Sequence, residues 1–269
     1  MRMLSCFFGV LLLAWPAYAQ APSAQVPSVF IEDLTWPEVR DAIAGGKRTA
    51  IIYVGSSEQN GPHMVIGKHN FVARALAQRI AEELGDALVY PILPYALAGN
   101  ALTRAGHMRF PGTVTLTPEA FFGVVRGVGQ SALTAGFKVV AIMGDHGGGQ
   151  DELALVAKEL NAEARASDAR VLFIGDLYAK SRVQMRELLA QRGLPTDEDH
   201  AGIHDTSALL AIETTPGQWI RKDKLPLAEA KTGVQGHPQF ATPELGKIYN
   251  DMKVDLALKQ IRSLLASGR

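Results

Sequence analysis

The sequence predicts a three-layer α/β/α sandwich built on a mainly parallel central sheet. Three apolar runs, "TAIIYVG" at 49–55, "FKVVAIMG" at 137–144 and "ARVLFIG" at 169–175, are typical of strands buried on both faces. Segments with helical periodicity separate these runs, and this alternation favours parallel strands joined by right-handed crossovers. No repeat or linker divides the chain, so we expect a single domain over residues 29–269.

The first elements carry clear end signals. "TWPE" at 35–38 is a capping box, in which Thr35 caps a short helix to about residue 44 and Glu38 reaches back to it. The segment 70–84 has apolar side chains at four-residue spacing and ends before a glycine, which predicts an amphipathic helix. "ALVYPILPY" at 87–95 predicts a strand that ends early or lies near an edge, because it contains Pro91.

The later elements follow the same alternation. "TPE" at 117–119 offers an N-cap, a proline at the first helical position and an acid in the first turn, so a helix should run from there to Gly136. The strand at 137–144 follows, and the strand at 169–175 is the last one predicted. Further helices are expected at about 152–166, 179–192 and 244–266.

The first residues are typical of a secretory signal peptide. Arg2 precedes an apolar run that is short for a membrane span, and Ala17-Tyr18-Ala19 fits the small-x-small cleavage rule. We expect cleavage after Ala19, a flexible lead-in at 20–28, and an exported, periplasmic protein. An uncleaved anchor is the alternative.

Composition excludes several classes of site and partner. Cleavage would remove Cys6, the only cysteine, so the mature chain would have no disulfide and no thiol ligand. It would also remove Arg2 from the 27 basic residues, leaving 26 against 27 acidic residues and a net charge of −1. This near-neutral balance argues against nucleic acid or a membrane as the partner.

Polar clusters follow the predicted strands, where ligands bind in open α/β sheets. "GSSEQNGPHMVIGKHN" at 55–70 and "GDHGGGQD" at 144–151 come directly after two of the apolar runs, and "DEDHAGIHDTS" at 197–207 lies in a later loop. Imidazoles and carboxylates without cysteines indicate a divalent transition metal such as Zn²⁺ or Mn²⁺. The histidines in or near these clusters are His63, His69, His107, His146, His200 and His204.

These clusters resemble the motifs of the creatininase (creatinine amidohydrolase) family. The 55–70 segment is similar to the family's G-S-x-E-Q-H-G-P-H-L-P-x-G-x-D, and "RFPGTVTLTPEAF" with "GFKVVAIMGDHGGG" is similar to its F-P-G-T and N-G-H-G-G-N blocks. "HAGIHDTS" resembles H-A-G-E-x-E-T-S. The resemblance covers about residues 48–215 in the correct order. It implies a creatininase-like α/β/α fold, hydrolysis of a cyclic or linear amide of a small molecule by metal-held water, two metal ions, and a homo-oligomer.

The chain departs from the family at the metal ligands. The resemblance implies Glu58, His146 and Asp205 as ligands, but Asn60 stands where the family has a histidine and His69 where it has an aspartate. A carboxylate can bridge two cations, whereas a neutral imidazole offers one lone pair to one cation. We therefore predict about one Zn²⁺ or Mn²⁺ per chain, held by Glu58, His69, His146 and Asp205.

Other residues receive supporting roles. His200 is the candidate for proton transfer to the leaving nitrogen. Asp145 is expected to orient His146 without binding the metal itself. The glycines that follow let backbone approach a ligand and offer amide hydrogens to an oxyanion. Structural roles are the alternative: a helix cap for Asp205 or His146, and a solvated helix end for His69. The remaining substrate-binding or supporting candidates are Asn60, His63, His107, Gly147 and Gly148.

Two functions remain open. The first is an exported metal-dependent amidohydrolase. The second is an inactive relative that binds a metal or a small molecule, which the ligand substitutions favour. A serine esterase is disfavoured because the nearest elbow-like stretch, "GQSAL" at 129–133, lacks the second glycine and lies inside a predicted helix. A phosphate-binding loop is disfavoured because no G-K-[ST] follows the glycines at 147–149.

Overall fold

The computed structural model describes residues 27–164 and 167–267. The predicted signal peptide at 1–19 and residues 20–26 of the predicted lead-in lie outside the described residues. Within the described ranges, no helix has the length and apolar character needed to span a bilayer.

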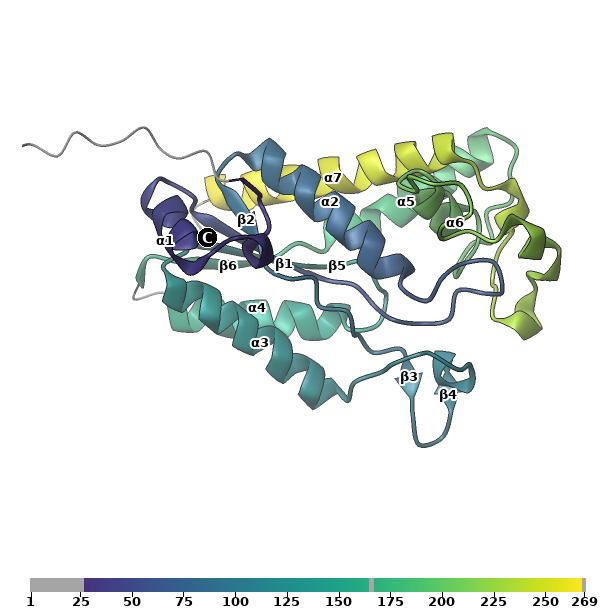
Figure 1. The fold of residues 1–269 in the computed structure, drawn as a ribbon, viewed down its shortest axis with the longest axis horizontal. Coiled ribbons are helices and arrows are strands. Elements are labelled where there is room, and N and C mark those ends of the chain that lie inside the picture. Colours follow the sequence, from purple (N-terminus) through teal and green to yellow (C-terminus); the bar gives the residue numbers. More distant parts are fainter. Residues whose placement is uncertain (1–26, 165–166, 268–269) are drawn as a thin grey trace, which may run out of the picture.

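The central sheet has four parallel strands in the order β2-β1-β5-β6 (Figure 1). The strands are β1 (Thr49–Val54), β2 (Ala87–Val89), β5 (Val139–Gly144) and β6 (Arg170–Phe173). The predicted parallel sheet is confirmed. β2 is shorter than the predicted 87–95 strand and lies at an edge, since Pro91 cannot donate to a strand ladder.

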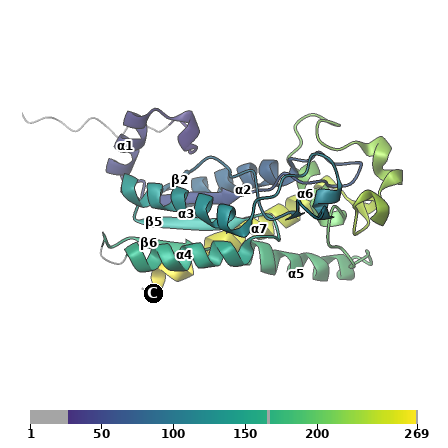
Figure 2. The same cartoon turned by 90° about the horizontal axis from the view of Figure 1, so that it is seen from below.

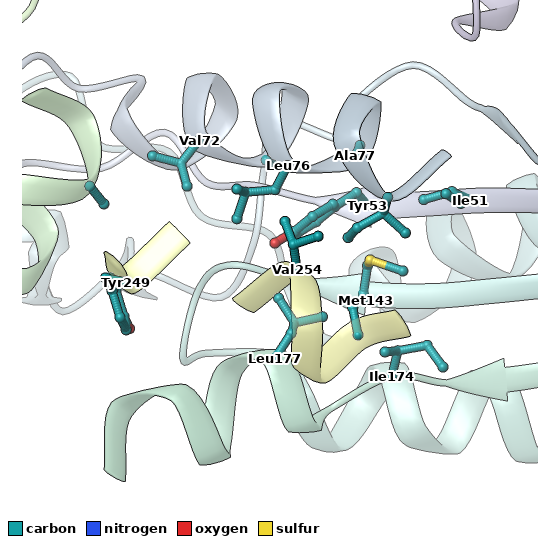
Figure 3. Close-up of a cluster of buried hydrophobic side chains, with 14 of the residues drawn as sticks. Ile51, Tyr53, Val72, Leu76, Ala77, Met143, Ile174, Leu177, Tyr249 and Val254 are labelled. Atoms are coloured by element: carbon teal, nitrogen blue, oxygen red, sulfur yellow. The ribbon is translucent and has the colours of Figure 1, made fainter. Parts of the chain in front are cut away.

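Helices cover both faces of this sheet (Figures 1 and 2). Side chains of β1 alternate between two cores: Ala50, Ile52 and Val54 pack with α3 and α4, whereas Ile51 and Tyr53 pack with α2, α5 and α7. Figure 3 shows Tyr53 and Met143 between the side chains of α2 and α7. The three-layer prediction is confirmed. These helices are α2 (Lys68–Leu84), α3 (Pro118–Ala135), α4 (Gln150–Ala164), α5 (Asp176–Gln191) and α7 (Pro243–Ala266).

Local end signals explain where the helices begin and end. In the predicted capping box, Thr35 N donates to Glu38 Oε2 over 2.6 Å before α1 (Trp36–Ala44). Thr117 Oγ1 accepts from Ala120 N at the start of α3. Gly85 closes α2 with a φ of 78°, a left-handed conformation that favours glycine.

Some elements were not predicted. A small antiparallel hairpin, β3 (Gly99–Asn100) and β4 (Ala105–Gly106), projects from the segment between β2 and α3 (Figure 1). Helix α6 (Ile203–Leu210) starts inside the third polar cluster with Gly202 as its N-cap and Asp205 in its first turn, whereas the structural alternative placed Asp205 at the cap of a helix that follows it. Short 3-10 helices occur at 31–33, 107–109, 222–227, 230–232 and 238–240.

The strand order places a ligand crevice between β1 and β5. From β1, the chain passes through α2 to β2 on one side, and from β2 it returns through α3, on the opposite face, to β5 on the other side of β1. The connections therefore diverge at the carboxyl ends of β1 and β5, which is where open α/β sheets bind ligands. The first two polar clusters of the sequence both begin there.

Helices α6 and α7 pack closely because α7 has a glycine at their contact. A Cβ on Gly246 would lie 1.7 Å from the carbonyl oxygen of Ser207 on α6. No larger residue fits at this point without moving one helix.

We predict that Gly246→Ala lowers the free energy of unfolding by about 1–3 kcal/mol through overpacking. The matched control is Gly127→Ala in α3, where an added Cβ meets no atom within 4 Å. The control should stabilise the protein by about 0.5–1 kcal/mol, the cost of glycine in a helix interior. Chemical denaturation of both variants measures the difference, and a Gly246→Ala protein as stable as the control contradicts the close packing.

Candidate active site

The loops after β1 and β5 meet at the carboxyl edge of the sheet. Glu58 follows the end of β1 by four residues, and Asp145 and His146 come directly after β5. The backbone N–H of Asp145 donates to the carbonyl oxygen of Val54 over 2.9 Å, so the two loops are tied together. The clusters predicted from sequence therefore converge in space.

The centre of the site is the fully buried carboxylate of Glu58, surrounded by four imidazoles. Its Oε1 lies 2.8 Å from His69 Nε2 and 3.8 Å from His200 Nδ1. Its Oε2 lies 2.8 Å from His146 Nε2 and 3.8 Å from His107 Nε2. Burial opposes ionisation, but the interactions with His146 and His69 hold the pKa of Glu58 well below its ordinary value.

His146 is fixed by the glycine turn that contains it. Its Nδ1 lies 3.1 Å from the carbonyl oxygen of Gly148 and 3.0 Å from the amide nitrogen of that residue. A Cβ on Gly148 would lie 2.1 Å from the carbonyl oxygen of Leu97, so this position requires glycine. A lone pair on Nε2 requires the proton on Nδ1, so in the ion-binding tautomer His146 Nδ1–H donates to the Gly148 carbonyl oxygen.

His69 is the second imidazole against Glu58 and is held by a carboxylate behind it. Its Nδ1 lies 2.7 Å from Asp145 Oδ2, and Asp145 Oδ1 accepts from Lys253 Nζ over 2.6 Å. A hydrogen bond from Nδ1–H to Asp145 leaves Nε2 directed at Glu58, the arrangement in which a carboxylate orients a metal-binding histidine. Burial raises the pKa of Asp145, but Lys253 and His69 lower it to about 2. Asp145 thus supports His69, not His146, the partner expected from sequence.

Glu58, His69 and His146 form a group that could hold one metal ion. Each offers one ligand atom, and the three atoms lie within 4.8 Å of one another. Although Glu58 Oε2 is 2.8 Å from His146 Nε2, it receives no hydrogen bond of acceptable geometry and is buried without a donor. Lone pairs on both atoms that point to a common ion would explain this close, non-hydrogen-bonded approach. The residues therefore fit a divalent ion.

Gln59 holds the other two imidazoles from their outer sides. The Nε2 amide of Gln59 lies 2.8 Å from His107 Nδ1 and 3.0 Å from the carbonyl oxygen of Gly233, while His200 Nε2 lies 2.9 Å from the carbonyl oxygen of Gln59. The assignment that satisfies these contacts places the His200 proton on Nε2 and the His107 proton on Nε2. His200 Nδ1 is then a free acceptor facing Glu58, and His107 presents a donor. Burial lowers the pKa of His200 to about 4 and also lowers that of His107.

Asp205 has a different set of contacts from the predicted ligands. Its Oδ1 lies 3.0 Å from Lys68 Nζ, and its Oδ2 accepts from the backbone N–H of Ala201 over 2.9 Å. It lines the cavity but belongs to none of the three-ligand groups found among the described residues. We therefore leave Asp205 out of the proposed ligand set.

Asn60 and His63, which sequence analysis placed in the site, do not line the cavity. Asn60 Nδ2 donates to the carbonyl oxygens of Glu58 and Val65, which closes the loop on itself. His63 Nε2 contacts Thr206 Oγ1 over 3.0 Å. Burial lowers the pKa of His63 to about 4. Both side chains shape the loop that carries Glu58.

The site opens into a polar cavity of about 360 Å³. The residues that line it include His107, Asp145, Gly147 and Gly148, which sequence analysis named as candidates. The lining residues that sequence analysis did not identify include Tyr178, Arg182, Gln235, Tyr249 and Lys253.

Lys253, Gln59 and Lys68 contact the site residues but were not identified from sequence, although a sequence pattern indicated two of them. Lys253 lies on the buried stripe of α7 with Gly246, Tyr249 and Ala257, where a lysine needs a partner. Gln59 is adjacent to Glu58 inside the first motif. No pattern indicated Lys68, because a lysine at the start of a helix is most often solvated.

Comparison with known proteins agrees with this architecture. The Creatininase (creatinine amidohydrolase) family profile matches residues 32–261. The chain is 27% identical over 254 residues to creatinine amidohydrolase from Pseudomonas putida, covering 87% of this chain and 96% of that protein. It is 28% identical over 204 residues to the mycofactocin precursor peptide peptidase from Mycolicibacterium smegmatis, covering 73% of this chain and 72% of that protein.

Solved structures show the same fold. A mutant creatininase of the Zn–Zn type superposes with a TM-score of 0.72 at 24% identity, and a structure described as creatininase Mn with 0.70 at 23%. Each covers 88% of this chain, and the match spans 98% of the other chain. The family profile spans nearly the whole described part of the chain. This protein therefore belongs to the creatininase (creatinine amidohydrolase) family.

Proposed function

We propose that this protein is an exported hydrolase that cleaves a C–N amide bond, cyclic or linear, of a small molecule with the help of one divalent ion, Zn²⁺ or Mn²⁺. The observation that carries the proposal is the buried Glu58 carboxylate between His69 Nε2 and His146 Nε2, each 2.8 Å away. An ion among these atoms would give Glu58 Oε2 the partner that it lacks. Relatives include both a zinc and a manganese form of creatininase.

The ion would supply Lewis-acid activation of a water molecule and polarisation of the substrate carbonyl. The protein's part is to orient the ligands. Asp145 fixes the ring of His69, and Gly148 fixes that of His146. Such outer contacts set the direction of the coordinating lone pairs.

His200 is placed to transfer the proton. Its Nδ1 faces the Glu58 carboxylate at 3.8 Å, and its Nε2 is anchored on the Gln59 carbonyl oxygen. Because burial lowers its pKa to about 4, the ring is neutral at neutral pH and able to accept a proton from the attacking water. The resulting imidazolium can deliver that proton to the leaving nitrogen. His107 presents an N–H beside the same space and can donate to a substrate oxygen.

The cavity argues for a small substrate. Its volume of about 360 Å³ lies near the lower end of the range for small-molecule pockets, roughly 300–1,000 Å³. The relatives differ in substrate, since one is named for creatinine and another for a precursor peptide. The size and polar lining favour a compact polar amide over a folded peptide segment.

The second candidate function is an inactive binder of a metal or small molecule. Lys68 Nζ lies 2.9 Å from His69 Nε2, close to the atom that would bind the ion. An ammonium there can occupy the same lone pair. Metal content and turnover on a broad amide panel separate the two functions, because stoichiometric metal without turnover supports the binder.

We predict that the purified protein carries about one Zn²⁺ or Mn²⁺ per chain and that His146→Ala releases it, since three protein ligands are the usual minimum. Elemental analysis measures the ratio, and Glu163→Gln on α4, whose side chain is 46% exposed and lies outside the cavity, is the control. Burial and Lys68 lower the pKa of His69, but Asp145 and Glu58 outweigh them, so the pKa is raised overall. Protonation of His69 should therefore weaken ion binding as the pH falls. Full occupancy in His146→Ala contradicts the ligand assignment.

We predict that His200→Ala lowers kcat by about 10²-fold or more while retaining the ion, because it removes the proton-transfer group and no ligand. Asp197→Asn, on the same loop and with an 80% exposed side chain, is the control. Steady-state kinetics on the best amide of the panel, with metal analysis of each sample, measures the effect. Unchanged kcat in His200→Ala excludes the proposed role.

We predict that the exported protein begins at Gln20, because the small residues at 17 and 19 fit the signal-peptidase rule. Mass spectrometry of the periplasmic fraction measures the N-terminus. Ala19→Leu should accumulate the precursor, whereas export with an intact Met1 is incompatible with cleavage.

A further inference from the structure

Two lysines are buried beside the site, although lysine is seldom fully buried without a partner. Lys68, the first residue of α2, is 1% exposed, and Lys253, near the middle of α7, is 4% exposed. Their ammonium groups are inside the protein, so each must be matched by a charge.

Each lysine contacts one acid of the site. Lys68 Nζ lies 3.0 Å from Asp205 Oδ1, and Lys253 Nζ lies 2.6 Å from Asp145 Oδ1. Asp145 and Asp205 both line the cavity that contains Glu58. Of these three acids, Glu58 has only histidines within 4 Å as ionic partners among the described residues.

We propose that Lys68 and Lys253 are built-in cations that each neutralise one acid of the cavity and thereby limit the site to a single divalent ion. This inference rests on the proposed function for the ion at Glu58 and assigns the role of the two lysines. Glu58, His107 and His200 also offer three atoms within 4.8 Å of one another, but this group shares Glu58 with the first ion, and His107 Nδ1 accepts from Gln59, which leaves an N–H on the ring atom that faces Glu58. A second ion in the cavity would therefore need Asp205 or Asp145 as a ligand. Both carboxylates are already paired, and a divalent ion beside a fixed ammonium is repelled.

The lysines cannot easily withdraw to admit a second ion. Their side chains originate on the buried faces of α2 and α7, and each ammonium group is held there by a carboxylate. Lys253 Nζ also lies 4.6 Å from the centre of the Tyr249 ring, a cation–π contact that adds to its ion pair. The positive charges are therefore fixed in place.

The two lysines differ in what they position. Through Asp145, Lys253 supports the ring of His69, so it acts on a proposed metal ligand through a carboxylate. Lys68 contacts Asp205 and also lies beside His69 Nε2. Removal of Lys68 should thus free both Asp205 and the Nε2 atom of His69, while the contact of His69 Nδ1 with Asp145 still orients the ring.

The experiment is metal titration of wild type, Lys68→Met and Lys253→Met, with the bound ion counted by elemental analysis after equilibrium dialysis against Zn²⁺ or Mn²⁺. We expect wild type to saturate at about one ion per chain and Lys68→Met to take about two, since the freed carboxylate is a hard oxygen ligand. The control is Lys247→Met on α7, whose side chain is 77% exposed, and it should match wild type.

Lys68→Arg and the double variant Lys68→Met/Asp205→Asn complete the design. Lys68→Arg keeps the ion pair with Asp205, and the double variant removes both of its charges. Both variants should therefore bind as many ions per chain as wild type. A Lys68→Met chain that is soluble only with a divalent ion also supports the proposal, provided that the double variant needs none. A second ion on wild type, or an unchanged count in both single methionine variants, overturns it. If wild type binds no ion and hydrolyses no amide, the proposed function fails, whereas the role of the lysines is still judged by the difference between Lys68→Met and wild type.

Discussion

The constraint on which the site depends is the complete burial of the Glu58 carboxylate. An ionised carboxylate away from water costs several kcal/mol unless positive or hydrogen-bonding groups surround it. Those groups come from four separate parts of the chain: His69 on α2, His107 after the β3–β4 hairpin, His146 after β5 and His200 before α6. The buried carboxylate of Glu58 is therefore stabilised only when all four segments have closed around it.

The sheet explains why this closure happens at one edge. Strands β1 and β5 are parallel neighbours in register from Thr49 opposite Val139 to Val54 opposite Gly144, so their following loops leave the sheet together. Helices α2 and α3 lie on opposite faces, and the crevice between them stays open. The long-range packing of α7 against α2, α5 and α6 then brings Lys253 to Asp145, 108 positions earlier in the chain.

The sequence predicted the elements of this fold and the residues that meet at the site, but not all of their contacts. Apolar runs and cap residues predicted the strands and helices, since those signals are local. The convergence of Glu58, His69, His146 and His200 was predictable because all follow strands or lie near the same motifs. The contacts of the two aspartates could not be predicted. Asp145 supports His69, and Asp205 contacts Lys68, because of side-chain directions and helix packing that no local pattern encodes. Asn60 was a candidate for support or substrate binding, and its amide closes the loop that carries Glu58.

The buried charges also bear on whether the altered motifs represent decay or a different site. Loss of an ion from the cavity would leave its acids without a cation, and such carboxylates tend to take up protons or destabilise the fold. Here Asp145 and Asp205 each have a fixed lysine, while Glu58 keeps two imidazoles at 2.8 Å and an oxygen without a donor. This pattern of paired and unpaired acids supports the proposed one-ion site.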